Sequence, residues 1–416
     1  MSHPVLIQKE RMENHKLPAY TWVILALITS THAMNIFSAR SIVPLAPFLQ
    51  DAFNLSHFQI GLFTSMYFMG ALVLSIPMGW MVDRIGIYYT MALGQLIVGS
   101  FIISLSCANG FVMLCVLLFL AGLGHAAINP ATGKAVMHWF SVRGRATAMS
   151  FKQTGIPMGG ALAAATLPSL ALFMGWRKAL IIAGSVSLFS VVLCLIFYRE
   201  PPAHEQQNNG DRFHREDFIA ILKNRNLMLL SGTMIIFLAL QSSLETYLIL
   251  FCKDWLCFPV VTAGFALSFT QVGAVGGRLL WGPVSDFIFK GRRKIVLAII
   301  GSFSSVICLS FVFLSPPLPA LLIGVMVFLF GACAIGWNGI YLTLVAELAG
   351  KGKEGIALGT SLTIIFVGQF LGPPIFGHIV DVTGTYRYAW LTFSLLMVGA
   401  TILLGLVKEP RKEFRV

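Results

Sequence analysis

The chain has 416 residues, of which 57% are hydrophobic and 11% charged, with a net charge of +12 and a mean hydropathy of +0.81. So few charged side chains cannot cover the surface of a soluble protein of this length, and that class is excluded. Lipid must therefore be the solvent for much of the surface. Crossing it requires helices of about 20 apolar residues, because every backbone polar group must be satisfied within its own segment.

Twelve apolar runs meet this requirement, so the sequence predicts an all-α integral membrane protein with twelve transmembrane helices. Residues 1–19 are charged and have no apolar core, so we predict no signal peptide and interpret the first apolar run as the first span. In chain order the predicted spans are 20–49, 58–82, 88–107, 111–138, 147–171, 177–198, 227–251, 260–283, 294–314, 320–346, 356–379 and 388–407.

One long polar stretch divides these spans into two groups of six. The predicted organisation is an N-terminal bundle over 1–198, a cytoplasmic linker over 199–225 and a C-terminal bundle over 226–416. Within the linker, Phe218, Ile219 and Leu222 fall on one helical face. This pattern fits a short helix on the membrane surface, and a plain linker is the alternative.

The basic residues predict the orientation. With both termini cytoplasmic, most of the 29 Lys and Arg side chains fall on the inner side, and only Arg177, Lys178, Lys253 and Arg387 fall outside. This positive-inside pattern favours a multi-pass protein of the cell inner membrane with an even number of spans. It also accounts for the net charge, so no nucleic acid is needed as a partner.

The cysteines and the known cofactor motifs suggest neither a metal nor a cofactor. The seven cysteines lack metal-ligand spacing, and no Walker-type sequence is present, so ATP is not expected to drive this protein. Cys252 and Cys257 flank a short segment and can pair if that loop is periplasmic. The alternative is that both remain free thiols.

The two halves of the chain repeat each other. Gly79 and Asp83 end the second predicted span, while Gly282 and Asp286 end the eighth, each 203 positions later. A repeat of half the chain in the same orientation predicts two pseudo-symmetric six-helix bundles with a binding site between them.

These residues also carry a family resemblance. The run GWMVDRIG (79–86) resembles the loop signature Gly-x-x-x-Asp-Arg-x-Gly of the major facilitator superfamily. The second copy, GPVSD (282–286), continues into GRRK (291–294), which matches the basic end of that signature. The first copy departs there, because Ile87 and Tyr88 replace the usual basic residues. The resemblance covers the whole chain and implies the two-bundle fold of that family.

In this family the loop is thought to hold one half against the other in the outward-open state. Carried to this sequence, the resemblance implies a conformational latch, and simple anchoring of the topology is the alternative. Glycines there let helices approach closely, and an aspartate favours a helix start. The latch residues are Gly79, Asp83, Arg84, Gly86, Arg278, Gly282, Asp286, Arg292 and Arg293. Arg278, one turn before Gly282, is predicted to serve the latch or to pair with Asp286.

Two further family patterns argue against a proton-driven drug exporter. Such exporters often carry an arginine four residues before a glycine in the fourth span, where this chain has Leu118 before Gly122. They also carry Gly-Pro-x-x-Gly-Gly in the fifth span, and here the corresponding run is GIPMGG (155–160), which is close but shifted.

Charged residues inside spans are costly and are therefore candidates for function. Arg40 lies within the predicted first span, and Lys152 opens the fifth. A buried guanidinium without a nearby acid needs an anion, and its planar fork fits a carboxylate or phosphate. Arg40 resembles in its placement the arginine of organophosphate–phosphate antiporters. For Arg40 the alternatives are pairing with Glu245 or reaching toward the membrane surface; for Lys152, the alternative is anchoring one helix end.

Further polar and aromatic residues complete the predicted substrate site. By resemblance, spans 1, 4, 7 and 10 line the cavity. A packing role is the alternative for the histidine and the aromatic residues. The remaining candidates are His125, Asn129, Gln241, Glu245, Gln271, Trp337, Asn338, Tyr341 and Gln369.

These observations predict a secondary transporter that moves a small organic anion, a carboxylate or phosphorylated metabolite, by alternating access. Proton symport is the predicted coupling, with Glu245 or His125 as the titrating group, and the protein is expected to be a monomer. Three rivals remain: an exporter of apolar or cationic compounds, a transporter-like receptor and a membrane enzyme. The enzyme ranks last, because the sequence has no convincing catalytic constellation.

Overall fold

The computed structural model describes residues 19–199, 215–350 and 353–409. The predicted charged N-terminus, most of the predicted linker and the last residues lie outside this part of the chain. Within it, all regular structure is helical and twelve segments are long and apolar enough to span a membrane. The predicted fold class is therefore confirmed.

The N-terminal bundle consists of α2 (Ala19–Ala39), α3 (Ala46–Phe53), α4 (His57–Ser104), η1 (Leu105–Cys107), α5 (Phe111–His125), α6 (Ile128–Trp139), α7 (Val142–Gln153), α8 (Gly155–Met174) and α9 (Trp176–Phe197). The C-terminal bundle consists of α10 (Arg215–Lys223), α11 (Arg225–Leu250), η2 (Phe251–Trp255), α12 (Val260–Pro283), η3 (Val284–Ile288), α13 (Arg293–Val312), α14 (Ala320–Ala334), α15 (Asn338–Ala349), α16 (Glu354–Thr383) and α17 (Tyr386–Leu404).

The first span is shorter than predicted. The sequence favoured one helix over 20–49, but α2 ends at Ala39, turns follow over 40–45, and α3 begins at Ala46. Pro47 lies in the first turn of α3, where proline is tolerated because that backbone N–H has no helical partner. Arg40 was predicted to lie inside the first helix, but it follows the end of that helix, in the turns that precede α3.

The predicted surface helix in the linker forms as α10. Among its described side chains Ile221 is buried, whereas Ile219 and Leu222, two of the residues used for the prediction, are exposed; the side chain of Phe218, the third, is outside the described part. The helix contacts α11 and α16, so it belongs to the C-terminal bundle.

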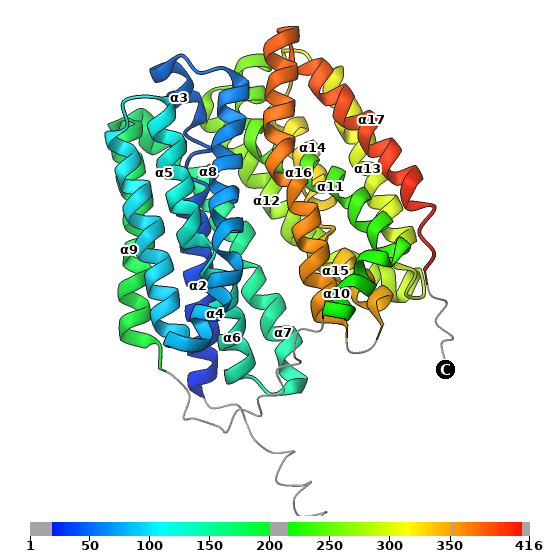
Figure 1. The fold of residues 1–416 in the computed structure, drawn as a ribbon. Coiled ribbons are helices and arrows are strands. Elements are labelled where there is room, and N and C mark those ends of the chain that lie inside the picture. Colours follow the sequence, from blue (N-terminus) through cyan, green and yellow to red (C-terminus); the bar gives the residue numbers. More distant parts are fainter. Residues whose placement is uncertain (1–18, 200–214, 351–352, 410–416) are drawn as a thin grey trace, which may run out of the picture.

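The two bundles lean toward each other at one end and diverge at the other (Figure 1). We call the end where α2 begins and α17 finishes the termini side, and the other end the opposite side. Contacts between the bundles are made mainly by α4 with α16 and by α8 with α12. These helices therefore frame any site that both bundles share.

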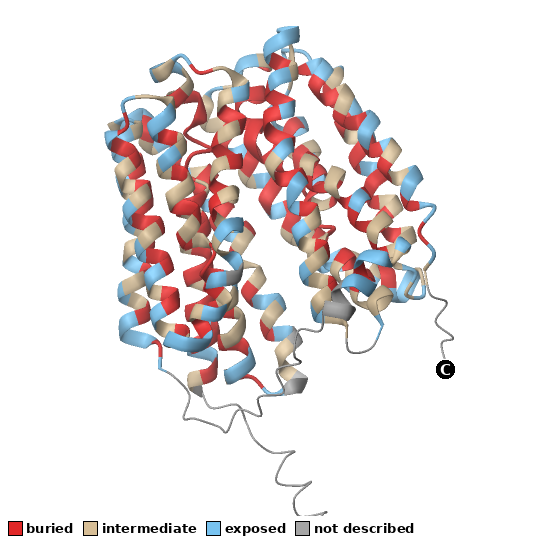
Figure 2. Cartoon of the chain, in the orientation of Figure 1, coloured by how far each residue is buried: buried red, intermediate tan, exposed pale blue. Residues whose placement is uncertain are grey.

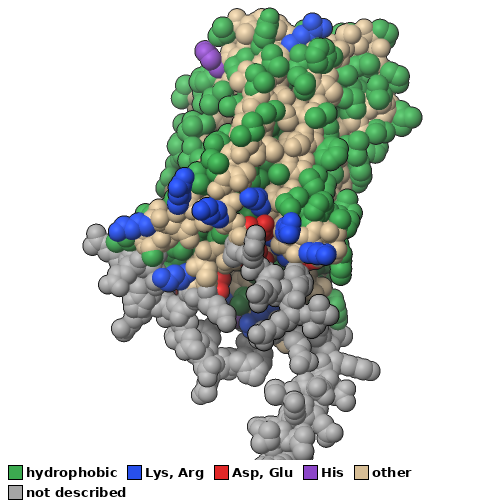
Figure 3. All heavy atoms as spheres, turned by 90° about the vertical axis from the view of Figure 1, so that its right-hand side faces the viewer, with side chains coloured by type: hydrophobic (Ala, Val, Ile, Leu, Met, Phe, Trp, Pro, Cys, Tyr) green, Lys and Arg blue, Asp and Glu red, His purple; other side chains and the backbone are tan. Residues whose placement is uncertain are grey.

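Burial follows a membrane pattern. Buried residues lie within each bundle and between the bundles, while outward-facing positions are exposed (Figure 2). Many of those exposed positions carry large apolar side chains, such as Phe173, Phe287 and Leu321. Figure 3 shows hydrophobic side chains over most of one face, with Lys and Arg gathered toward the termini side. This apolar surface fits lipid contact.

Candidate functional site

A pocket lies between the bundles. Residues of α2, the turn over 40–45, α4, α5 and α8 line it on one side, and residues of α11 and α12 line it on the other. Its cavity has a volume of about 40 Å³ in this conformation, within about 600 Å³ of space between atoms that includes open solvent. Four of the predicted substrate residues line it: Arg40, His125, Glu245 and Gln271. Thr64, Tyr67 and Phe68 also line it, although sequence reasoning did not select them.

An ion pair joins the bundles in this pocket. Arg40 Nη1 lies 2.5 Å from Glu245 Oε1, with side chains 17% and 10% exposed. Gln271 Nε2 donates to the same carboxylate oxygen over 3.2 Å. Pairing of Arg40 with Glu245 was one of the alternatives open from the sequence, and it is the arrangement that the structure adopts.

The surroundings of this pair carry additional positive charge. Arg278 interacts electrostatically with both Arg40 and Glu245, and its Nη1 donates across the bundles to the Gln153 carbonyl over 3.3 Å. Its Nε has no hydrogen-bond partner. Lys152 is buried and donates to Asn129 Oδ1 over 3.4 Å. Arg278 is thus a second basic group that interacts with this ion pair, while Lys152 lies outside the pocket lining.

Arg278 does not pair with Asp286, which was one of its predicted roles. Asp286 instead forms an ion pair of 2.5 Å with Arg293, which follows it across a short turn. Arg278 lies on the part of α12 that faces α8, so its side chain reaches the N-terminal bundle.

A chain of amides fixes the tautomer of His125. Gln95 Nε2 donates to the Thr31 carbonyl oxygen over 2.7 Å, and a carbonyl oxygen can only accept. The other end of the amide, Gln95 Oε1, therefore accepts from Asn35 Nδ2 over 3.2 Å. Asn35 Oδ1 then faces His125 Nδ1 at 2.6 Å. The hydrogen in that contact must belong to Nδ1. When the ring carries one proton, Nε2 therefore presents a lone pair.

The other predicted substrate residues lie outside the pocket lining. Trp337 and Tyr341 are fully buried, and their rings pack on each other 5.5 Å apart. Asn338 Nδ2 donates to Gln241 Oε1 over 3.4 Å within the C-terminal bundle. Gln369 is buried in α16. In this conformation these groups pack helices against one another, the alternative that the sequence left open for the aromatic residues.

Apart from Arg278, which reaches Gln153 of the other bundle, the predicted latch residues with described contacts make them within single bundles. Asp83 pairs with Lys134 at 2.7 Å, and the Arg84 guanidinium lies 4.2 Å from the centre of the Trp80 ring. Gly86 has a φ of 88°, which lets α4 turn between its two spans. A Cβ at Gly79 would meet no atom within 4 Å.

The second copy of the signature behaves in the same way. Arg293 pairs with Asp286 and lies 3.6 Å from Glu347, and its backbone N–H donates to Glu409. Arg292 precedes α13, and a Cβ at Gly282 would also meet no atom within 4 Å. Among the described latch residues, only Arg278 therefore makes a polar contact between the bundles, through its bond to the Gln153 carbonyl.

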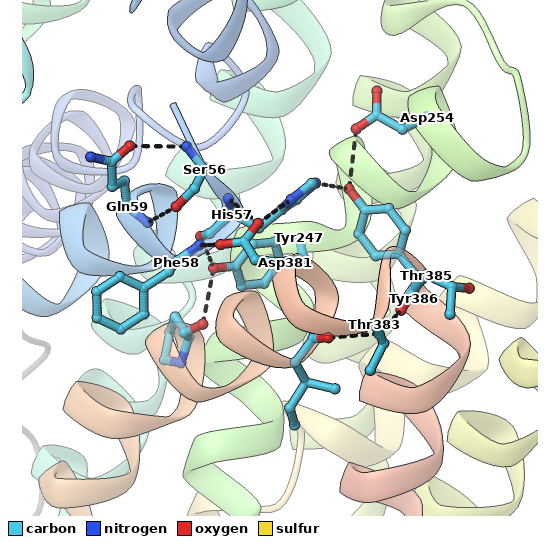
Figure 4. Close-up of polar contacts among 12 residues, drawn as sticks. Ser56, His57, Phe58, Gln59, Tyr247, Asp254, Asp381, Thr383, Thr385 and Tyr386 are labelled. Atoms are coloured by element: carbon cyan, nitrogen blue, oxygen red, sulfur yellow. Dashed lines mark hydrogen bonds and ion pairs between the residues drawn. The ribbon is translucent and has the colours of Figure 1, made fainter. Parts of the chain in front are cut away.

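The opposite side is closed by direct contact between the bundles. Figure 4 shows Asp381 of α16 at the start of α4, where its carboxylate accepts the backbone N–H groups of His57 (2.9 Å) and Phe58 (2.8 Å). A carboxylate there satisfies free N–H groups and the positive end of the helix. Tyr247 Oη adds a bond to the His57 carbonyl over 2.6 Å.

Glycines make this approach possible. A Cβ on Gly377 would lie 2.4 Å from the His57 carbonyl oxygen and 2.3 Å from Tyr247 Oη, and one on Gly61 would lie 2.6 Å from the Pro373 backbone. Both distances to Gly377 are shorter than real Cβ contacts, and one neighbour is backbone. Sequence reasoning missed this surface, although the Ser56–Gln59 capping box marks the start of α4 there.

Gly377→Leu is expected to hold the opposite side open and to lower transport at least about tenfold, because the side chain cannot fit against the His57 carbonyl. Reactivity of a cysteine at Thr64 toward an impermeant thiol reagent added from that side should rise, with Cys107 and Cys257 changed to serine. Gly324→Leu is the control, since a Cβ there meets no atom within 4 Å. Unchanged reactivity in Gly377→Leu would show that this contact does not set closure.

Cys252 and Cys257 do not form a disulfide. Both are free thiols, with Cys252 buried and Cys257 exposed after the π turn η2. The described residues also contain no group of three or more metal-binding side chains.

Comparisons with known proteins agree with the fold. Residues 28–373 match the family model of the Major Facilitator Superfamily. The hexuronate transporter of Bacillus subtilis is 25% identical, over 93% of this chain and 93% of that protein. The probable sulfoacetate transporter SauU of Cupriavidus necator is 26% identical, over 85% and 86%. A crystal structure of the nucleoside transporter NupG superposes with a TM-score of 0.77 at 15% identity, covering 93% of this chain and 100% of that one.

Proposed function

Because this chain belongs to the Major Facilitator Superfamily, we propose that it is a secondary transporter that carries a small organic anion across the cell inner membrane by alternating access. Both termini are cytoplasmic in this proposal, so the opposite side faces outward. The contacts around Asp381 then close the outer side, whereas a Cβ at Gly79 or Gly282 on the inner side would meet no atom within 4 Å. Together these features correspond to an inward-facing state.

The observation that carries the proposal is the Arg40–Glu245 ion pair inside a pocket shared by both bundles. A guanidinium fork binds a carboxylate in two parallel hydrogen bonds, and Glu245 occupies only part of that fork. A substrate carboxylate competes with Glu245 for Arg40, while Arg278 and Lys152 supply a field that attracts anions. The similar hexuronate and sulfoacetate transporters carry anions by name, which supports the same class here.

A proton on Glu245 makes this exchange favourable. Protonation removes the charge that pairs with Arg40, so the incoming anion finds a free guanidinium and the buried charges still balance. Moving the anion with a proton also avoids transferring net charge, which costs about 2.3 kcal/mol per 100 mV against an inside-negative potential. The proposed reaction is therefore anion–proton symport.

His125 supplies a second point of recognition. Its Nδ1 hydrogen is committed to Asn35, and its Nε2 is on a side chain that lines the same pocket as Arg40. An Nε2 lone pair accepts a hydroxyl hydrogen from the solute, while the neighbouring rings of Tyr67 and Phe68 cover the imidazole. The proposed substrate is thus a carboxylate that also carries a hydroxyl group.

Uptake into proteoliposomes tests the proposal. With an inward proton gradient, labelled glucuronate, a hydroxylated carboxylate, is expected to accumulate. Sulfoacetate, which has no hydroxyl group, should accumulate less, and the cation tetraphenylphosphonium should not accumulate. Collapse of the gradient with a protonophore should reduce accumulation to equilibration. Transport of the cation without the anions would favour an exporter of apolar or cationic compounds. Binding of an anion without its transport would favour a receptor.

A further inference from the structure

The closed opposite side contains a polar cluster that the proposed transport chemistry does not use. His57 comes from the N-terminal bundle, and its ring lies between two partners from the C-terminal bundle (Figure 4). Nδ1 lies 2.8 Å from Asp381 Oδ1, and Nε2 lies 2.9 Å from Tyr386 Oη. Tyr386 Oη in turn donates to Asp254 Oδ2 over 3.1 Å.

These three contacts require three hydrogens. An ionised carboxylate supplies none, the tyrosine hydroxyl supplies one, and a neutral imidazole supplies one. Two ionised aspartates with a neutral histidine would therefore leave one contact without a hydrogen. The cluster holds together as drawn only when it carries one additional proton.

The imidazole is the group that accommodates this proton. Asp381 already accepts three N–H donors, namely the backbone groups of His57 and Phe58 and the His57 ring. Asp254 accepts the Tyr386 hydroxyl and lies 3.8 Å from Lys253 Nζ. With Asp254 ionised beside Lys253, both carboxylates are acceptors and both ring nitrogens of His57 donate.

Charged and titratable groups approach the cluster from every element around it, and together they favour one positive charge on the ring. Ionised Asp254 and Asp381 carry two negative charges, whereas Lys253 is shared with Asp51 of α3 at 3.3 Å. The groups are Asp51 on α3, Tyr247 on α11, Lys253 and Asp254 in η2, Asp381 on α16, and Tyr386 on α17, while His378 of α16 lies against the Phe58 ring.

We propose that His57 is a proton-binding site created by closure of the opposite side. The ring holds two protons while the bundles are joined there and releases one when they separate, because separation removes both C-terminal partners at once. The His57 and Asp381 side chains are 21% and 25% exposed, so the proton exchanges with water on that same side. This proton therefore shifts the equilibrium between the closed and the open opposite side. The inference does not depend on the anion proposed above.

The direction of the pH effect follows from this proton count. Closure takes up a proton, so the ratio of closed to open molecules rises as the pH falls, by up to about tenfold per pH unit for one proton. At higher pH the neutral ring leaves one contact unsatisfied, and the opposite side opens more readily.

Distances between the bundles test the proposal without any substrate. Spin labels at Val112 and Leu321, exposed residues near the opposite-side ends of α5 and α14, report separation in a cysteine-free protein in nanodiscs. Between about pH 8 and about pH 5.5 the short-distance population is expected to grow in the otherwise native protein. His57→Gln should abolish this dependence.

Two further variants make the result decisive. Tyr386→Phe removes the acceptor at Nε2, so it should weaken the pH dependence while retaining the fold. His378→Gln changes an exposed histidine three residues before Asp381 and should leave the dependence intact. Distances that do not change with pH in the native protein, or a pH dependence that survives in His57→Gln, would overturn the inference.

Discussion

Arg40→Gln is expected to lower anion uptake at least about 30-fold, because truncating one member of a buried charge pair costs about 2 kcal/mol or more. The variant removes the fork that would bind the substrate carboxylate and leaves Glu245 with the Gln271 amide as a hydrogen-bond donor. Initial rates of labelled glucuronate uptake into proteoliposomes measure the effect, with binding followed separately by thermal stabilisation.

Three companion variants separate recognition from folding. Arg40→Lys keeps the charge but loses the planar fork, so uptake should remain strongly reduced if recognition is bidentate. Arg177→Gln makes the same change in an arginine that contacts the Ser106 carbonyl and Trp176, and uptake should persist. The Arg40→Gln, Glu245→Gln double variant should recover thermal stability without transport. Full uptake by Arg40→Gln would remove this residue from the site.

Glu245→Gln is expected to separate binding from accumulation. The neutral amide no longer exchanges a proton, so a gradient of one pH unit loses its capacity to drive about tenfold accumulation. Arg40 then lacks a counter-charge within the protein, and an anion supplies it. Thermal stabilisation by glucuronate should therefore be larger than in the native protein, and exchange of labelled for unlabelled anion should continue.

Glu354→Gln is the matched control, because this glutamate lies in the first turn of α16 and outside the pocket. Its accumulation should equal that of the native protein. If Glu245→Gln still accumulates the anion against its gradient, the coupling proton must bind elsewhere. Loss of binding together with accumulation would instead give Glu245 a direct role in holding the solute.

Local sequence features predicted the membrane architecture well. Helices of about 20 apolar residues follow from the need to satisfy backbone polar groups in lipid, and this need acts within each segment. The break after Ala39 was missed, since the apolar run continues through it to Leu49. Hydropathy indicates whether a segment is surrounded by lipid, protein interior or water. It does not detect a short turn whose apolar side chains are buried in the protein.

The sequence predicted some residues of the site and missed others. Arg40 and Glu245 were found because charge inside a span is rare and costly. Asn35 and Gln95, which fix the tautomer of His125, are neutral amides on different helices, and nothing in their sequence neighbourhood marks them. Asp381 was missed for a related reason, because it acts by accepting the backbone N–H of His57 at the start of α4, 324 positions away in the sequence.

By itself, the sequence determined twelve spans, two related halves and the presence of unpaired-looking charges in the membrane, because each of these depends on composition or on local periodicity. Only the tertiary structure decided which charges meet, which side of the molecule is closed and which hydrogens the closing contacts require. Those properties depend on distances between helices from different bundles. Such distances are set by packing at glycines such as Gly61 and Gly377, whose role is visible only when the facing backbone is in place.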